Sequence, residues 1–181
     1  MAKYVVLLRG INVGGKNKLP MADLRTCLEK LGFRSVSTYI ASGNVILESD
    51  KTPSDIQELI EKDLPKVFKL DSELIKVLAL SQKQLQDIVD NKPKGFGELP
   101  QEYYSDAVFL MGIDAAEAMS VFSPREGVDK VWQGDGVIYS QRLGAERVRS
   151  RLSKIIGTLP YKSMTIRSWG TVATLLELLK K

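Results

Sequence analysis

Histidine is absent from the 181 residues of this chain, and cysteine occurs once, as Cys27. Without histidine the chain lacks the usual general base, the commonest zinc ligand and every Ser-His or Cys-His nucleophile. A single cysteine cannot form an internal disulfide, which fits a reducing compartment. We therefore expect neither a zinc nor an iron–sulfur site, and no cofactor.

Long apolar runs are also missing. No stretch approaches the roughly 18 apolar residues of a membrane span, and the N-terminus lacks the layout of a signal peptide. The hydrophobic fraction of 44% and the charged fraction of 27% are typical of a folded soluble protein. We expect a cytoplasmic protein without a membrane partner.

Apolar patterning predicts the order strand, helix, strand, strand, helix, strand, and the order occurs twice. The first copy comprises strands at 3–9, 33–41, 44–49 and 73–80, with helices at 20–31 and from Thr52. The second comprises strands at 106–111, 129–133, 137–141 and 163–166, with helices at 114–122 and 146–156. The letters VVLLRGIN at 5–12 also align with AVFLMGID at 107–114. This self-similarity indicates an internal duplication.

The expected fold class is α+β, with two ferredoxin-like (βαββαβ) repeats, largely antiparallel sheets and a C-terminal helix. Residues 1–80 form the first repeat, 81–102 a connecting helix and loop, and 103–166 the second repeat. Residues 167–181 form the last helix, with Trp169 at the head of its apolar side as a core anchor.

The stretch RGINVGGKNK at 9–18 resembles the phosphate-binding loop G-x-x-x-x-G-K-[ST] but differs at its last position. Asn17 stands where that loop has a magnesium-binding hydroxyl, and Pro20 delays the following helix. The predicted sheet is also antiparallel rather than parallel. These differences argue against a nucleotide-hydrolase loop.

A different anion site remains open at this position. In a ferredoxin-like unit the loop after the first strand and the hairpin after the second emerge at one end of the sheet. Glycine N–H groups and polar side chains there can wrap an anion. The candidate ligand-binding residues are Arg9, Asn12, Gly14, Gly15, Lys16, Asn17, Ser42, Gly43, Asn44 and Arg167. The other interpretation is that the glycines only permit tight turns and the lysines are solvated.

Residues 142–167 hold seven cationic side chains and one acid, although the whole chain has a net charge of only +4. The helix predicted at 146–156 places Arg147, Arg151 and Lys154 on one face. Such a strip contacts phosphate backbones. The candidate nucleic-acid-binding residues are Arg142, Arg147, Arg149, Arg151 and Lys154. The alternative is a solvated helix face.

Three motifs resemble an uncharacterised bacterial family, domain of unknown function 1697: LLRGINVGGKNKLPMADLR, YIASGNVI and MTIRSWGTV. The resemblance implies a small cytoplasmic protein with a duplicated ferredoxin-like fold, and it implies no established activity. Its signature positions here would be Arg9, Gly10, Asn12, Gly14, Gly15, Lys16, Asn17, Ser42, Gly43, Asn44, Arg167 and Trp169. Ser168 and Gly170 stand where the family motif commonly has asparagine.

Two functional hypotheses follow. The first is a non-catalytic binder of a phosphate-bearing partner, above all nucleic acid, through the basic segment. The second is an enzyme or sensor for a small anionic metabolite at the Gly10–Lys18 loop and the Ser42–Asn44 hairpin. No carboxylate pair suited to acid–base catalysis stands out, so the sequence does not decide whether a reaction occurs.

Overall fold

The computed structural model describes residues 1–71 and 75–181, and the chain divides into two compact units. The first unit comprises Met1–Gln86 and Leu175–Lys181, and the second comprises Asp87–Thr174. The division falls within α3 (Gln82–Asp90) and within α5 (Trp169–Lys180). Within the described residues, no helix is long and apolar enough to cross a membrane.

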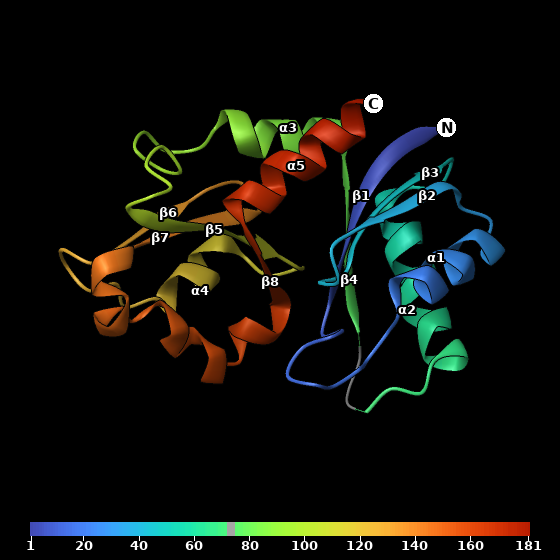
Figure 1. The fold of residues 1–181 in the computed structure, drawn as a ribbon, viewed down its shortest axis with the longest axis horizontal. Coiled ribbons are helices and arrows are strands. Elements are labelled where there is room, and N and C mark those ends of the chain that lie inside the picture. Colours follow the sequence, from blue (N-terminus) through green and yellow to red (C-terminus); the bar gives the residue numbers. More distant parts are fainter. Residues whose placement is uncertain (72–74) are drawn as a thin grey trace. The chain divides into compact units, whose positions relative to one another are not determined.

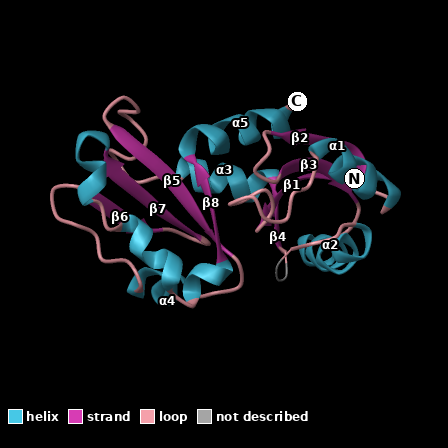
Figure 2. Ribbon diagram, turned by 60° about the horizontal axis from the view of Figure 1, so that its bottom comes forward, coloured by secondary structure: helices cyan, strands magenta, loops and turns pink. Residues whose placement is uncertain are grey.

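A four-stranded antiparallel sheet with two helices on one face forms the first unit (Figures 1 and 2). The sheet order is β2-β3-β1-β4. Its elements are β1 (Ala2–Arg9), α1 (Met21–Lys30), β2 (Arg34–Tyr39), β3 (Asn44–Ser49), α2 (Pro53–Val67) and β4 (Lys76–Ser81). Of the strand predicted at 73–80, residues 73 and 74 lie outside the described residues.

Alternate residues of β1 supply the centre of this unit's core. Tyr4, Val6 and Leu8 point to one face and pack with buried residues of α1 and α2. On α2 the buried positions are Ile56, Ile60 and Leu64, a stripe with helical spacing. Cys27 of α1 is buried in the same cluster, as its spacing predicts. Burial raises the pKa of its thiol, which makes it a packing residue rather than a nucleophile.

Reciprocal side-chain hydrogen bonds cap the N-termini of α2 and α3 (Gln82–Asp90). Thr52 Oγ1 accepts a hydrogen bond from the backbone N–H of Asp55, and the Asp55 carboxylate accepts one from the Thr52 N–H. Ser81 and Gln84 make the same reciprocal pair at the start of α3. These bonds satisfy N–H groups that the first helical turn leaves without backbone partners.

The second unit also contains a four-stranded antiparallel sheet, in the order β6-β7-β5-β8. Its elements are β5 (Tyr103–Leu110), α4 (Ala115–Ser120), β6 (Asp129–Gln133), β7 (Val137–Leu143), three 3₁₀ helices and β8 (Met164–Ser168). The 3₁₀ helices are η1 (Gly144–Arg149), η2 (Leu152–Gly157) and η3 (Pro160–Ser163). Together with α4, η2 and η3 contribute side chains to a core that includes Val108 and Ile138.

The prediction of one helix at 146–156 is wrong. Ser150 has an extended backbone, with φ −60° and ψ 144°, and separates η1 from η2. In an α-helix the N–H of Arg151 would donate to the carbonyl of Arg147, but here it donates to Asp129 Oδ2 at 2.8 Å. Ser150 Oγ accepts from the N–H of Leu152 at 3.2 Å. These side-chain acceptors compete with the helical hydrogen bonds and break the helix.

The last helix, predicted to begin at Arg167, begins at Trp169 in the structure. β8 continues through Ser168, where Asp106 is its partner on β5, and α5 begins at Trp169. Arg167 therefore lies on a strand, opposite Ala107, and not at the start of a helix. A strand position gives Arg167 no helix N-terminus that would favour an anion beside it.

Three aromatic rings surround the loop residue Phe96 in the second unit. Phe96 is fully buried, and its ring centroid lies 5.0 Å from that of Trp169, 5.2 Å from Tyr139 and 5.9 Å from Trp132. All three contacts are edge-on, the arrangement that aromatic quadrupoles favour. The Tyr139 hydroxyl donates to the Ile88 carbonyl at 2.6 Å, and burial raises the pKa of Tyr139 to about 12. The expected packing role of Trp169 is met in this cluster.

We predict that Phe96→Ala lowers the free energy of unfolding by about 3 to 5 kcal/mol, because a large fully buried ring is lost. Leu99→Ala in the same loop, where the side chain is half exposed, should cost about 0.5 kcal/mol. Urea denaturation followed by tryptophan emission measures both, since the chain's two tryptophans contact Phe96. Equal losses in the two variants would contradict the cluster's role.

Candidate functional site

The Gly10–Lys18 loop and the 40–43 turn do lie together in the first unit, and the Asn12 side chain joins them. Its Nδ2 donates to the Leu19 carbonyl at 3.0 Å and to the Ala41 carbonyl at 2.9 Å. Its Oδ1 accepts from the Leu19 N–H at 2.7 Å. The amide is therefore occupied by backbone groups.

Asn17 closes the base of the same loop. It is 1% exposed, and its Nδ2 donates to the Gly10 carbonyl at 2.8 Å. Its Oδ1 accepts from the backbone N–H of Asp71 at 2.8 Å, while its own N–H donates to Asp71 Oδ2 at 3.1 Å. Both Asn12 and Asn17 have positive φ, of 53° and 47°, a conformation that asparagine tolerates better than most residues.

The 40–43 turn is fixed in a similar way. Asn44 Nδ2 donates to the Tyr39 carbonyl at 3.0 Å and to Ser42 Oγ at 2.9 Å. The Gly43 carbonyl accepts from the N–H of Leu8 at 2.9 Å. A Cβ on Gly43, whose φ is +82°, would lie 2.9 Å from the Leu8 carbonyl oxygen. The close approach of β1 therefore requires glycine here.

Accessible groups of the loop are concentrated at its apex. Gly14 and Gly15 have φ of 58° and 75°, and the Lys16 N–H donates to the Val13 carbonyl at 2.9 Å. This is a two-residue turn with two left-handed residues. Val13 is 65% exposed, and the side chains of Lys16 and Lys18 are exposed as well.

The two candidate arginines of this site, Arg9 and Arg167, are less exposed than the residues of the apex. Arg9 is half-buried at the end of β1, opposite Lys76 of β4. Arg167 belongs to the second unit and is buried, with Nη1 donating to Thr165 Oγ1 at 2.8 Å and to the Ile166 carbonyl at 2.9 Å. Burial lowers the pKa of Arg167 to about 10, so it stays charged at neutral pH.

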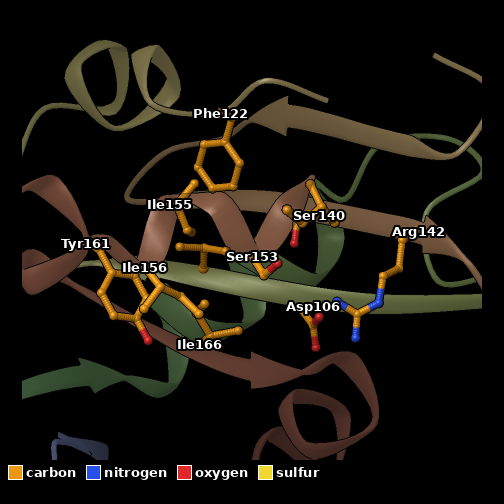
Figure 3. A pocket seen from close by; sticks show the side chains of 11 residues that line it. Asp106, Phe122, Ser140, Arg142, Ser153, Ile155, Ile156, Tyr161 and Ile166 are labelled. Atoms are coloured by element: carbon orange, nitrogen blue, oxygen red, sulfur yellow. The ribbon is translucent and has the colours of Figure 1, made fainter. Parts of the chain in front are cut away.

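A cavity of about 150 Å³ opens between the sheet and η2 in the second unit (Figure 3). We call it the β5–β7 pocket. Sheet pairing sets its floor, because Asp106 lies opposite Ser140 and Val108 lies opposite Ile166. Its lining comprises Asp106, Val108, Phe122, Ser140, Arg142, Leu152, Ser153, Ile155, Ile156, Tyr161 and Ile166.

Two opposite charges stand at one end of this pocket. Burial raises the pKa of Asp106, and the nearby Arg142 guanidinium opposes part of that rise. The same guanidinium lies 5.4 Å from the centroid of the Tyr104 ring, and its Nε is buried without a hydrogen-bond partner. Sequence reasoning missed Asp106 and Ser140. The available signal was a carboxylate inside the apolar strand SDAVFL, since aspartate is rarely buried unless paired.

The basic segment does not form the predicted strip. Arg142 lines the pocket, Arg149 pairs with Glu146 at 3.2 Å, and Arg151 is half-buried. Arg147 and Lys154 are exposed, but on separate 3₁₀ helices. Val148, which the helical pattern assigns to a buried stripe, is 89% exposed. The prediction that Arg147, Arg151 and Lys154 share a helix face is therefore wrong.

Asp129 organises the backbone around this segment. Its Oδ2 accepts from the backbone N–H groups of Arg125 at 3.0 Å and of Arg151 at 2.8 Å. Burial alone would raise the pKa of the carboxyl. The hydrogen bonds from Arg151, Ser150 and Arg125, together with the charge of Arg142, outweigh burial and hold the pKa below its ordinary value.

No group of three or more metal-ligating side chains is found within residues 1–71 and 75–181. The pocket offers one carboxylate, and the loop apex offers none. The pocket therefore provides charged groups and hydrogen-bonding groups for recognition of a ligand.

A family model described as "Protein of unknown function (DUF1697)" matches residues 1–139. The solved structure of a conserved bacterial protein, SP0830 from Streptococcus pneumoniae, is similar, with a TM-score of 0.80 and 26% sequence identity. That similarity covers 98% of both chains. No curated protein sequence matches the chain.

We predict that Gly43→Ala costs about 3 kcal/mol of unfolding free energy, because a left-handed φ and a backbone clash add together. Gly14→Ala is the matched control, since it has a positive φ but nothing within 4 Å of the new Cβ. It should cost about 1 kcal/mol. Urea denaturation followed by circular dichroism separates the two, and equal losses would show that the contact with Leu8 does not matter.

Asp129→Asn should lower the free energy of unfolding by about 1 to 3 kcal/mol at pH 7, because charge-assisted hydrogen bonds to the backbone are weakened. A carboxyl whose pKa is lowered by folding stabilises the protein above that pKa and loses this contribution on acidification. The gap between variant and wild type should therefore narrow below about pH 4. A gap that is constant from pH 7 to pH 3 would contradict the electrostatic account.

Proposed function

This chain belongs to the DUF1697 family, whose description assigns no activity, and we propose that it is a non-catalytic binder of a phosphate-bearing partner, above all single-stranded nucleic acid. The contacting surface is the exposed part of residues 142–167. We call its three exposed cations the exposed cation set: Arg147, Lys154 and Lys162.

The observation that supports this proposal is the division of the basic segment into engaged and unengaged cations. Arg149 pairs with Glu146, and the side chains of Arg142, Arg151 and Arg167 are half-buried or buried. For the side chains of the exposed cation set, no hydrogen bond or ion pair is found within the described residues. Unpaired exposed cations are the groups that exchange counterions for phosphates.

Exposed aliphatic side chains in the same segment favour single strands over duplexes. Val148 is 89% exposed, Leu159 77% and Ile156 58%. A duplex presents phosphates on its outside and hides its base faces, whereas unpaired bases present apolar faces beside phosphates. A partner with both features matches a surface on which cations alternate with aliphatic groups.

A site for a small anionic metabolite at the Gly10–Lys18 loop and the Ser42–Asn44 hairpin remains an alternative proposal. Its support is now limited to the apex, where Gly14, Gly15 and Lys16 are exposed. The amides of Asn12, Asn17 and Asn44 have backbone partners and would contribute no direct contact.

We also propose that the two units are ferredoxin-like repeats that arose by duplication. The sheet orders β2-β3-β1-β4 and β6-β7-β5-β8 are the same when strands are counted within each unit. The 3₁₀ helices of the second unit occupy the place in the chain that α2 has in the first. The aligned letters at 5–12 and 107–114 add sequence support.

We predict that labelled single-stranded RNA or DNA binds the full chain with an affinity that falls as salt rises, as measured by fluorescence anisotropy. Arg147→Glu/Lys154→Glu should weaken binding more than tenfold. It should also reduce the slope of log affinity against log salt by about 1.4, because two phosphate contacts are lost.

The control is Lys62→Glu/Lys69→Glu, which makes the same change in net charge at exposed positions of the first unit. This variant should keep nearly the wild-type affinity. Absence of binding at low salt, or equal weakening by both double variants, would rule out the proposed surface.

A further inference from the structure

The β5–β7 pocket contains polar groups whose hydrogen-bonding capacity is not used. The Asp106 carboxylate makes no hydrogen bond and no ion pair with any described residue, although burial disfavours its charge. The buried Nε of Arg142 has no partner, and the hydroxyl of buried Ser140 makes no hydrogen bond within the described part of the chain. Of these groups, Arg142 Nε is the buried atom without a partner. Because buried polar groups in folded proteins nearly always have partners, this atom requires an explanation.

We propose that this pocket binds a small apolar α-amino acid, with its carboxylate on Arg142, its ammonium on Asp106 and its side chain against the apolar wall. The proposal does not depend on the exposed cation set, although Ile156 lies both on the proposed nucleic-acid surface and at the opening of the pocket. It supplies the missing partners of two charged side chains with one molecule.

The presence of both charges selects this class of ligand. A purely anionic molecule that reached Arg142 would place its charge beside the Asp106 carboxylate, and like charges at short range repel. A purely cationic molecule bound to Asp106 would be repelled by the positive charge of Arg142. Only a molecule with both charges on adjacent groups satisfies both side chains, and Figure 3 shows these two side chains at the same end of the pocket.

The rest of the lining favours an aliphatic or aromatic side chain. The apolar part of the lining comprises Val108, Phe122, Leu152, Ile155 and Ile166, together with the ring of Tyr161. The volume of about 150 Å³ is far above the roughly 10–15 Å³ that a single water needs. Ile156 and Ile166 line the pocket yet are partly exposed, so they mark the side open to solvent.

The stability of the empty protein provides a separate readout. An acid whose pKa is raised by folding destabilises the folded state above that pKa, and the cost disappears as pH falls through it. Asp106→Asn removes a charge whose burial the nearby Arg142 offsets only in part, and it keeps the size of the side chain. The variant should therefore be more stable than the wild type at pH 7, with a difference that vanishes in acid.

The binding experiment is isothermal titration calorimetry of the full chain with L-leucine, L-isoleucine and L-phenylalanine. Two analogues of leucine serve as ligand controls, 4-methylpentanoate without the ammonium and 3-methylbutylamine without the carboxylate. We expect at least one amino acid to bind, and each analogue to bind at least tenfold more weakly than leucine. Asp106→Asn and Arg142→Gln should each abolish binding.

Arg147→Gln, which changes an exposed cation outside the pocket, should bind as the wild type does. Three results would overturn the inference: no heat with any of the three amino acids at millimolar concentration, equal affinity for leucine and either analogue, or full binding by Asp106→Asn when circular dichroism shows that variant folded. None of these results bears on nucleic-acid binding, and loss of nucleic-acid binding leaves the pocket's test unchanged.

Discussion

The second unit depends on the two hydrogen bonds that the carboxylate of Asp129 accepts from the backbone. One oxygen accepts two backbone N–H groups, from Arg125 before β6 and from Arg151 between η1 and η2. The bond to Arg151 removes a donor that a continuous helix would need. The chain therefore turns at Ser150, and η2 packs Leu152 and Ile155 against the sheet. The wall of the pocket and the exposure of Lys154 on the outer side both follow from this break.

The seven cationic side chains of residues 142–167 lie in different environments in the folded chain. Arg149 pairs with Glu146, and the positive charge of Arg142 acts on the carboxyl groups of Asp106 and Asp129. For the side chains of Arg147, Lys154 and Lys162, no acidic partner is found within the described residues. Local charge in the sequence therefore overstates the charge available to a partner, because it counts engaged and unengaged side chains alike.

Much of the architecture was predictable from the letters. Strand positions followed from apolar runs, and the starts of α2 and α3 followed from Thr52 and Ser81. The helix at 146–156 was not predictable, because its apolar spacing is helical and the group that breaks it, Asp129, is distant in sequence. The roles of Asn12 and Asn17 were not predictable either. Their residue types indicate polar contacts, but only the fold reveals that backbone carbonyls take those amides.

The way in which Asn12 and Asn17 hold the Gly10–Lys18 loop indicates where the loop can accept inserted residues. Its base is held by side-chain bonds from Asn12 and Asn17 to Gly10, Leu19, Ala41 and Asp71, and its apex is closed by one short backbone contact between Val13 and Lys16. Lengthening a flexible loop adds little closure entropy, about 0.6 kcal/mol for each doubling. Residues inserted between Gly14 and Gly15 would therefore leave the anchoring bonds intact. The position is a natural attachment point for a spectroscopic tag or a grafted peptide.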